Sequence, residues 1–330
     1  IAFAAYVCFF PQLVAGPIER ATNLLPQFLR ERKFEYHQAV DGLRQILWGL
    51  FKKMVIADNC AEYANLMFSQ PDAYNGMSLF LGALFFTFQI YGDFSGYSDI
   101  AIGTSRLFGF NLRQNFAYPY FSRDIAEFWR RWHISLSTWF RDYVYIPLGG
   151  SRVSKGKQIR NVFIIFLVSG FWHGANWTFI FWGALNAIFF LPLLLSSRNR
   201  NHLDVVAQNS VLPSLRELFQ LLSTFLLTVF AWIFFRAQSI TDAFAYLNGI
   251  FDPSLLSIPD FQGREGALMT IMLVIFLLVI EWMGRRNQYG IEKLMLKANR
   301  ALRWLFYFFL VFLIFMFSRT EDTPFIYFQF

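Results

Sequence analysis

Three long apolar stretches constrain the fold of this chain more than any other feature. A helix needs about 20 mostly apolar residues to cross the core of a bilayer, with a range of about 17 to 25. Residues 215–235, 266–283 and 301–317 fall in that range. Inside lipid the backbone must satisfy its own hydrogen bonds, so such segments cross as helices. The stretches predict an all-α protein that crosses a membrane several times.

Composition supports this prediction. Hydrophobic residues make up 56% of the chain and charged residues only 15%, whereas soluble domains carry about 25% charged residues. The net charge is +7. Because the basic residues form short clusters between apolar runs, they are typical of cytoplasmic loops, and we do not expect nucleic acid to be a partner. We expect membrane lipid to surround the protein.

Two further apolar runs lie close together in the middle of the chain. Residues 161–172 are too few to cross a bilayer, whereas residues 176–195 are long enough. Because only three or four residues separate the runs, we expect a broken or re-entrant hairpin around Trp172, His173 and Gly174. A sixth apolar run, residues 77–91, continues into the more polar stretch "GDFSGYSDIAIG".

The charges of the loops predict an orientation. Short loops rich in Lys and Arg tend to stay in the cytoplasm, and residues 152–160 and 198–200 carry basic side chains without an acid. Residues 241–265 carry four acidic side chains against the single Arg264, so we expect them outside. By alternation, residues 285–303 lie inside and the tail, residues 318–330, lies outside.

The stretch "FWRRWHISLSTWFRDYVYIPLGG" combines tryptophan with arginine. On one continuous helix its large apolar side chains would share a face: Phe128, Trp132, Leu136, Trp139 and Tyr143. This pattern predicts an amphipathic helix at the membrane interface. Arg130 and Arg131 would then either anchor the helix or bind an anionic ligand such as the phosphates of a cofactor. His133 lies among the aromatic residues, where a packing role is open.

The stretch "SGFWHGANW" places His173 at membrane depth, beside a break in the helix. Ionisable residues at this depth usually face a cavity or a water-filled path, and broken backbone is tolerated there for the same reason. A neutral imidazole is also the best general base near pH 7. We therefore favour a functional role for His173 over a packing role.

The stretch "YGDFSGYSDIAIG" carries Gly92, Gly96 and Gly103 on one helical face, which predicts close packing against another helix. Asp93 and Asp99 are unusual at this depth. Either carboxylate would line the same cavity as His173 or hold the tautomer of a histidine.

Several kinds of site are not supported. The chain has no GxSxG, Walker A, dinucleotide-binding or HExxH motif. Its two cysteines, Cys8 and Cys60, have no zinc-site spacing, so we predict no metal site and no disulfide. No linker or repeat divides the sequence, and we expect one membrane domain over residues 1–330. Since the chain begins at Ile1 in the middle of a pattern, we expect a fragment that lacks N-terminal spans.

Four motifs together resemble one known family. The stretches "FPQLVAGPIER", "GDFSGYSDIAIG", "FWRRWHISLSTWFRDYVYIPLGG" and "SGFWHGANWTFIFWG" are similar, in order and spacing, to the membrane-bound O-acyltransferases. Within that family they most resemble the bacterial alginate O-acetylation branch. The resemblance runs from Phe10 to the end of the chain, where "PFIYFQF" also fits.

This resemblance implies a bundle of transmembrane helices around a central tunnel, in the bacterial inner membrane. It implies transfer of an acyl group, expected to be acetyl, from a cytoplasmic thioester such as acetyl-CoA, with no bound cofactor. The acceptor would be a hydroxyl on an extracytoplasmic polysaccharide or on a partner protein. The invariant histidine of the family maps onto His173, and the second suspected histidine onto His133.

Acyl transfer also needs a donor for the developing oxyanion, and Asn176, Trp172 or Trp177 could supply it. Two alternatives stay open. The acceptor could be teichoic acid or peptidoglycan, or the chain could be a small-anion transporter of the inverted-repeat kind. The second alternative predicts two similar halves, which the sequence does not show.

Overall fold

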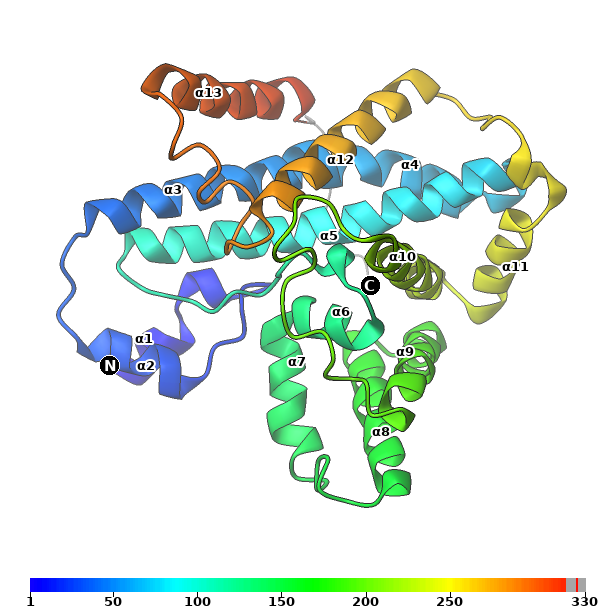
Figure 1. The fold of residues 1–330 in the computed structure, drawn as a ribbon, viewed down its shortest axis with the longest axis horizontal. Helices are drawn as coiled ribbons and strands as arrows, with labels where there is room; N and C mark the ends of the chain where they lie inside the picture. The colour runs from blue at the N-terminus through cyan, green and yellow to red at the C-terminus, as the bar shows by residue number, and fades with distance from the viewer. Residues whose placement is uncertain (319–324, 326–330) are drawn as a thin grey trace.

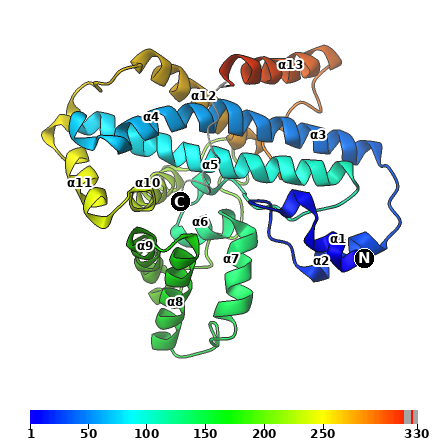
Figure 2. The same ribbon diagram turned by 180° about the vertical axis from the view of Figure 1, so that it is seen from behind.

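Two long helical rods lie antiparallel across the whole molecule (Figures 1 and 2). One rod is continuous from α3 (Tyr36–Leu50) through the π-helix η2 (Phe51–Ala57) to α4 (Asp58–Ser69), and the other is α5 (Gly76–Leu107). This computed structural model describes residues 1–318 and 325, and the regular elements among them are all helical. The expected all-α fold is confirmed.

Glycines bring the backbones of the two rods into contact. A Cβ atom on Gly49 would lie 2.6 Å from the carbonyl oxygen of Gly96, and one on Gly103 would lie 2.5 Å from that of Gly42. Both distances are far below van der Waals contact, so only glycine fits. The predicted small-residue face of α5 is therefore confirmed, and its partner is α3.

Among the described residues, five helices are long and apolar enough to cross a membrane, and they include the three spans expected from the sequence. These five are α5, α9 (Trp177–Leu195), α10 (Leu215–Arg236), α12 (Arg264–Gly284) and α13 (Arg300–Phe317). The chain is thus a multi-pass membrane protein. The expected hairpin is also present, because α8 (Lys155–His173) packs along α9 and the two helices are separated only by residues 174–176. Its first turn begins already at Lys155, within the basic segment.

The expected continuous helix over residues 128–143 is wrong. The chain forms α6 (Ile125–Arg131), breaks at Trp132 and His133, and resumes as α7 (Ile134–Phe140) and the π-helix η5 (Arg141–Tyr145). His133 has a left-handed backbone, with φ of 42°. The break is held from outside, since the Ile134 amide donates to the carbonyl of Asn115 at 2.9 Å. Tertiary hydrogen bonds thus replace helical ones, and Phe128 and Tyr143 share no common face.

The acidic segment 241–265 contains helix α11 (Ile240–Ile250), which packs on α5 through a hydrogen bond from the Tyr246 hydroxyl to the Leu79 carbonyl. The location of this segment on the extracytoplasmic side of the membrane stays a prediction. The expectations for "PFIYFQF" and for the C-terminal tail concern residues 319–324 and 326–330, which lie outside the described residues apart from Phe325.

The remaining elements are short. They are α1 (Ala2–Val7), α2 (Ala21–Leu29) and the 3₁₀ turns η1 (Phe10–Gln12), η3 (Pro71–Ala73), η4 (Pro119–Phe121) and η6 (Pro253–Leu256). Residues 196–214, which we call the strap, join α9 to α10 without a regular helix. The helices α6 to α9 lie together on one side of the long rods, and α13 lies on the other side (Figure 1).

Candidate active site

A cavity of about 1000 Å³ lies between α7 and the α8–α9 hairpin. Its walls come from α6, α7, η5, α8, α9 and the strap. Helix α8 contributes one face along its whole length: Lys155, Gln158, Val162, Ile165, Phe166, Ser169 and His173. Because an α-helix rises 1.5 Å per residue, the cavity follows α8 over about 27 Å from Lys155 to His173.

The two predicted histidines meet at one end of this cavity, and both line it. His173 is the last residue of α8, and His133 precedes α7 at the chain break. The ring of Trp172 contacts both, at centroid distances of 6.3 Å to His133 and 5.0 Å to His173. The fold thus brings His133 next to Trp172 and His173, which lie in a different helix. Trp172 remains 49% exposed, so it also reaches the surface.

Asn115 fixes the orientation of His133. Its side-chain oxygen accepts hydrogen bonds from the backbone amide and the hydroxyl of Ser135, at 3.2 and 2.8 Å, and lies 3.0 Å from His133 Nδ1. An oxygen that faces Nδ1 must accept, so Nδ1 carries the proton and Nε2 keeps its lone pair. His133 therefore presents a hydrogen-bond acceptor on its second nitrogen.

Sequence reasoning missed Asn115. It is fully buried, and its amide nitrogen donates to the Ser98 hydroxyl on α5 at 3.1 Å. The stretch "LRQNFAYPY" has no motif that singles it out. Asn115 reaches His133 only because the connector that follows α5 folds back beneath α7.

His173 is surrounded by aromatic rings. Besides Trp172, it contacts the Trp182 ring of α9 at 5.3 Å and the Phe235 ring of α10 at 5.0 Å. Both of these rings are 2% exposed. These rings cover the α9 and α10 sides of His173, whose side chain stays partly exposed toward the cavity.

The two arginines proposed as anion ligands differ in position. Arg130 lines the cavity, but its guanidinium donates to the carbonyls of Asn199 and His202 in the strap at 2.8 and 2.7 Å. Arg131 is bound to Glu127 at 2.8 Å and to the carbonyls of Ala117 and Asp204. A role of either arginine in anion binding stays a prediction, and the geometry gives both a structural task.

Two more predicted site residues also have structural contacts. Asn176 caps α9: its oxygen accepts from the Thr178 amide, while its nitrogen donates to the Gln238 carbonyl at 2.9 Å. Asp93 forms an ion pair with Lys53 at 2.8 Å, and Asp99 forms one with Lys52 at 2.6 Å. The side chain that holds the tautomer of His133 is Asn115. Roles for Asn176 and Asp93 in the reaction remain untested predictions.

Comparison with known proteins identifies relatives of this chain. Residues 1–221 match the model of the MBOAT, membrane-bound O-acyltransferase family. The chain is 39% identical over 302 residues to "Probable alginate O-acetylase AlgI" of Pseudomonas aeruginosa, which covers 91% of this chain and 55% of that protein.

Two other relatives carry different names. The chain is 41% identical over 250 residues to "Peptidoglycan O-acetyltransferase" of Helicobacter pylori, which covers 75% of this chain and 46% of that protein. It is 31% identical over 195 residues to "Teichoic acid D-alanyltransferase" of Bacillus subtilis, which covers 56% of this chain and 49% of that protein. The chain spans about half the length of these relatives.

Proposed function

Because the chain belongs to the membrane-bound O-acyltransferase family, we propose that it is an O-acyltransferase. It moves an acetyl group from a cytoplasmic thioester, such as acetyl-CoA, to a hydroxyl group outside the cytoplasmic membrane of a bacterium. Residues 1–330 act in this proposal as one membrane domain. The observation that carries it is the cavity that runs the length of α8 and has both histidines at one end.

The proposed chemistry needs a base, a donor to the oxyanion and a dry site. His173 takes the proton from the acceptor hydroxyl while the oxygen of that hydroxyl attacks the carbonyl carbon of the thioester. The tetrahedral intermediate then expels the thiolate, which recovers that proton, so the products are an ester and a thiol. His133, whose Nε2 is an acceptor, orients the attacking hydroxyl.

The indole N–H of Trp172 is the favoured oxyanion donor. Trp172 contacts both histidines, whereas the side-chain amide of Asn176 already donates to the Gln238 carbonyl. An oxyanion donor has to lie close to the reacting carbon in order to stabilise its developing charge. Only Trp172 of these two has a contact with both rings.

The proposed acceptor is an alginate-like exopolysaccharide, or a partner protein that passes the acetyl group on to it. The names of several relatives indicate alginate O-acetylation. The second candidate is peptidoglycan, because the relative named for peptidoglycan O-acetylation has 41% identity over 75% of this chain.

Replacement of His173 tests the proposal. His173→Ala should lower acetyl transfer at least about 100-fold, which is the usual contribution of general acid–base catalysis. The protein should stay in the membrane at normal abundance, because the change only widens a cavity wall. Acetyl content is measured separately on extracellular polysaccharide and on peptidoglycan, which distinguishes the two acceptors. Ser169→Ala, on the same face of α8, is the matched control.

Normal acetylation by His173→Ala at equal abundance would remove this residue from the mechanism. Loss of both acetylation and abundance in His173→Ala, but not in Ser169→Ala, would assign it a structural task instead.

The proposed orientation is tested with single cysteines. Gly156 is exposed with no atom near its Cβ position, and Gln262 is exposed on the acidic segment. In a Cys8→Ser background, Gln262→Cys should react with an impermeant thiol reagent on intact cells and Gly156→Cys only after lysis. The buried Cys60 serves as the internal negative control. The opposite labelling pattern would invert the topology.

A further inference from the structure

We propose that Arg200, on the strap, binds a phosphate group of the acyl donor at the end of the cavity opposite the histidines. This inference rests on the proposed function and makes it more specific: the donor is a thioester on a phosphorylated, extended arm. Three features support it: the charge of the cavity, the contacts of its other cations and the fixed position of the strap.

The cavity favours an anion. Its lining includes the cationic side chains of Arg130, Arg141, Lys155 and Arg200, and none of its lining residues is an aspartate or glutamate. Several like charges around one partly enclosed space raise the local potential and attract a ligand of opposite charge. Lys155 begins α8 and His173 ends it. Because the Lys155 ammonium contacts the Ser197 hydroxyl, the strap passes the end of α8 opposite His173 three residues before Arg200.

Three of the four cations already have partners. Arg130 donates to two strap carbonyls, and Lys155 Nζ lies 3.1 Å from both the Leu194 carbonyl and the Ser197 hydroxyl. Arg141 forms an ion pair with Asp142 at 2.8 Å. Within the described part of the chain, Arg200 is the lining cation whose guanidinium has no hydrogen bond or ion pair. A free guanidinium in a basic cavity is ready to receive an anion.

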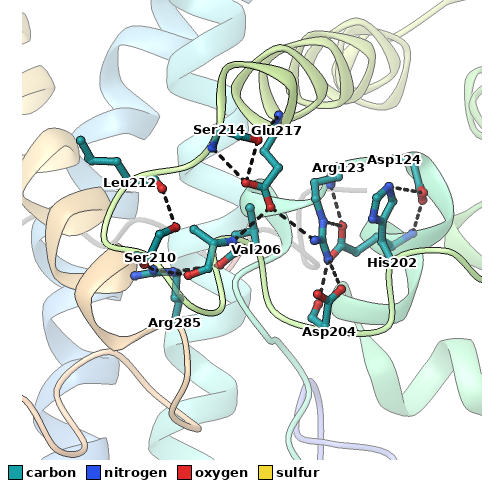
Figure 3. Close-up of polar contacts among 12 residues, drawn as sticks. Arg123, Asp124, His202, Asp204, Val206, Ser210, Leu212, Ser214, Glu217 and Arg285 are labelled. Carbon is teal, nitrogen blue, oxygen red and sulfur yellow. Dashed lines mark hydrogen bonds and ion pairs between the residues drawn. The ribbon is translucent and has the colours of Figure 1, made fainter.

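The strap that carries Arg200 is held in place by other arginines (Figure 3). Arg123 donates to the carbonyl and the carboxylate of Asp204, both at 2.9 Å. Arg285, from the end of α12, donates to the carbonyls of Val206, Ala207 and Ser210 at 3.1, 2.9 and 2.7 Å. With Arg130 bonded at Asn199, the residue next to Arg200 is fixed as well. A binding group on a fixed backbone loses less entropy when its ligand arrives.

This arrangement separates two roles for arginine. The arginines of the "FWRR" stretch are positioning residues, because their guanidinium groups hold the strap. Arg200 is the residue that meets the ligand. A guanidinium matches the oxygens of a phosphate with two parallel hydrogen bonds, which a lysine cannot reproduce.

The distance between the two ends defines the ligand. Along α8, Lys155 and His173 are about 27 Å apart. The middle of this wall is apolar, with Val162, Ile165 and Phe166. A thioester at the histidines therefore needs a long, flexible arm to reach a phosphate at Arg200. An acylated phosphopantetheine arm has this chemistry, whether it belongs to coenzyme A or to a carrier protein.

The test is a binding measurement on the purified protein in lipid nanodiscs, so it needs no turnover. Three probes are compared by calorimetry: acetylpantetheine without phosphate, acetyl-4′-phosphopantetheine and acetyl-CoA. Arg200→Gln should weaken binding of the phosphorylated probes about tenfold, as expected for a hydrogen bond between charged groups, and leave acetylpantetheine unchanged. Arg198→Gln, on the same strap, exposed and outside the cavity lining, should change nothing.

Each other outcome has a definite meaning. An equal loss for acetylpantetheine would show that Arg200 only shapes the strap, and no loss for any probe would remove it from recognition; both overturn the inference. A loss confined to acetyl-CoA supports it with coenzyme A as the source of the phosphate. If binding depends on the phosphate and on Arg200 but the protein transfers no acetyl group, the role of Arg200 stands and the proposed function is wrong. If acetyl transfer is normal but Arg200→Gln does not change binding, the proposed function stands and the role of Arg200 is wrong.

Discussion

The pair of long rods and the group of helices around the cavity solve the same problem in opposite ways. Both place polar side chains within apolar helices. In the rods, 78% of the most apolar part of α5 is buried, backbones touch at glycines, and charges pair internally. Around the cavity only 39% of the corresponding part of α9 is buried, and both histidines line the cavity. A polar residue in such a helix therefore indicates a site only when its surroundings are hollow.

The largest effect is expected from breaking an ion pair in the rods. Lys52 is 3% exposed and lies 2.6 Å from Asp99 and 2.9 Å from the Ser95 hydroxyl. Removal of one partner of a buried pair costs about 3–5 kcal/mol, so Lys52→Met should sharply lower the thermal midpoint and the amount of protein in the membrane.

The double variant Lys52→Met/Asp99→Leu should regain most of that loss, since no unpaired charge remains. A Lys52→Met variant that melts like the parent protein would contradict the idea that the rods depend on internal pairing.

The second effect concerns the hollow region, where function should fail without loss of stability. His133→Asn removes the imidazole but suits the left-handed backbone, in which asparagine is tolerated. Acetyl transfer should fall about 100-fold while the thermal midpoint stays within a few degrees. If transfer persists at normal abundance, His133 serves packing alone.

The third effect compares one small substitution in each region. A Cβ on Gly96 would lie 2.8 Å from the Gly49 carbonyl oxygen, and overpacking of this kind costs about 1–3 kcal/mol. Gly96→Ala should lower the thermal midpoint measurably. Ser169→Ala adds no atom at the cavity wall, so it should lower the thermal midpoint less than Gly96→Ala. Equal midpoints for the two variants would erase the difference between the regions.

The smallest effect is expected at the surface of the strap. Partial burial raises the pKa of Asp204, but hydrogen bonds from Arg123 outweigh it, so that pKa lies below its usual range. A lowered carboxyl pKa stabilises the fold above about pH 3.9, the unfolded value, and this gain disappears as the pH falls through the folded pKa. Because the side chain is 52% exposed, the gain is under about 1 kcal/mol.

Thermal midpoints of the parent and of Asp204→Asn, measured between about pH 3 and pH 7, test this. The parent should be slightly more stable at neutral pH, and the gap should close toward pH 3. A gap that widens on acidification would contradict the ion pair with Arg123.

The sequence predicted the elements that depend on local pattern. The lengths of apolar runs placed α10, α12 and α13, and the glycine spacing of α5 predicted a tight helix pair, because both signals are written within one segment. The break at His133 could not be found in this way. It depends on hydrogen bonds that Asn115 accepts from the backbone of Ile134 and from the His133 ring, across about 18 residues of sequence.

The arginines show the same limit. A run such as "FWRR" shows that the side chains are charged but not where they point. From the sequence alone, the guanidinium groups of Arg130 and Arg131 could equally contact a ligand or a backbone carbonyl. Only the fold shows that the strap passes beside them. In the sequence Arg200 counts only as one basic residue of a short loop, because nothing in the stretch "SSRNR" distinguishes it from Arg198.

The way in which the strap is held has a consequence for how its sequence can change during evolution. Three arginines donate hydrogen bonds to backbone carbonyls of the strap, which every amino acid provides: Arg130, Arg131 and Arg285. The path of residues 196–214 is therefore encoded mainly outside the strap, in α6 and at the end of α12. The strap of a related protein can therefore differ in sequence and keep the same backbone path, provided that these three arginines are retained. A change at one of those arginines would instead redirect a segment in which no residue had been altered.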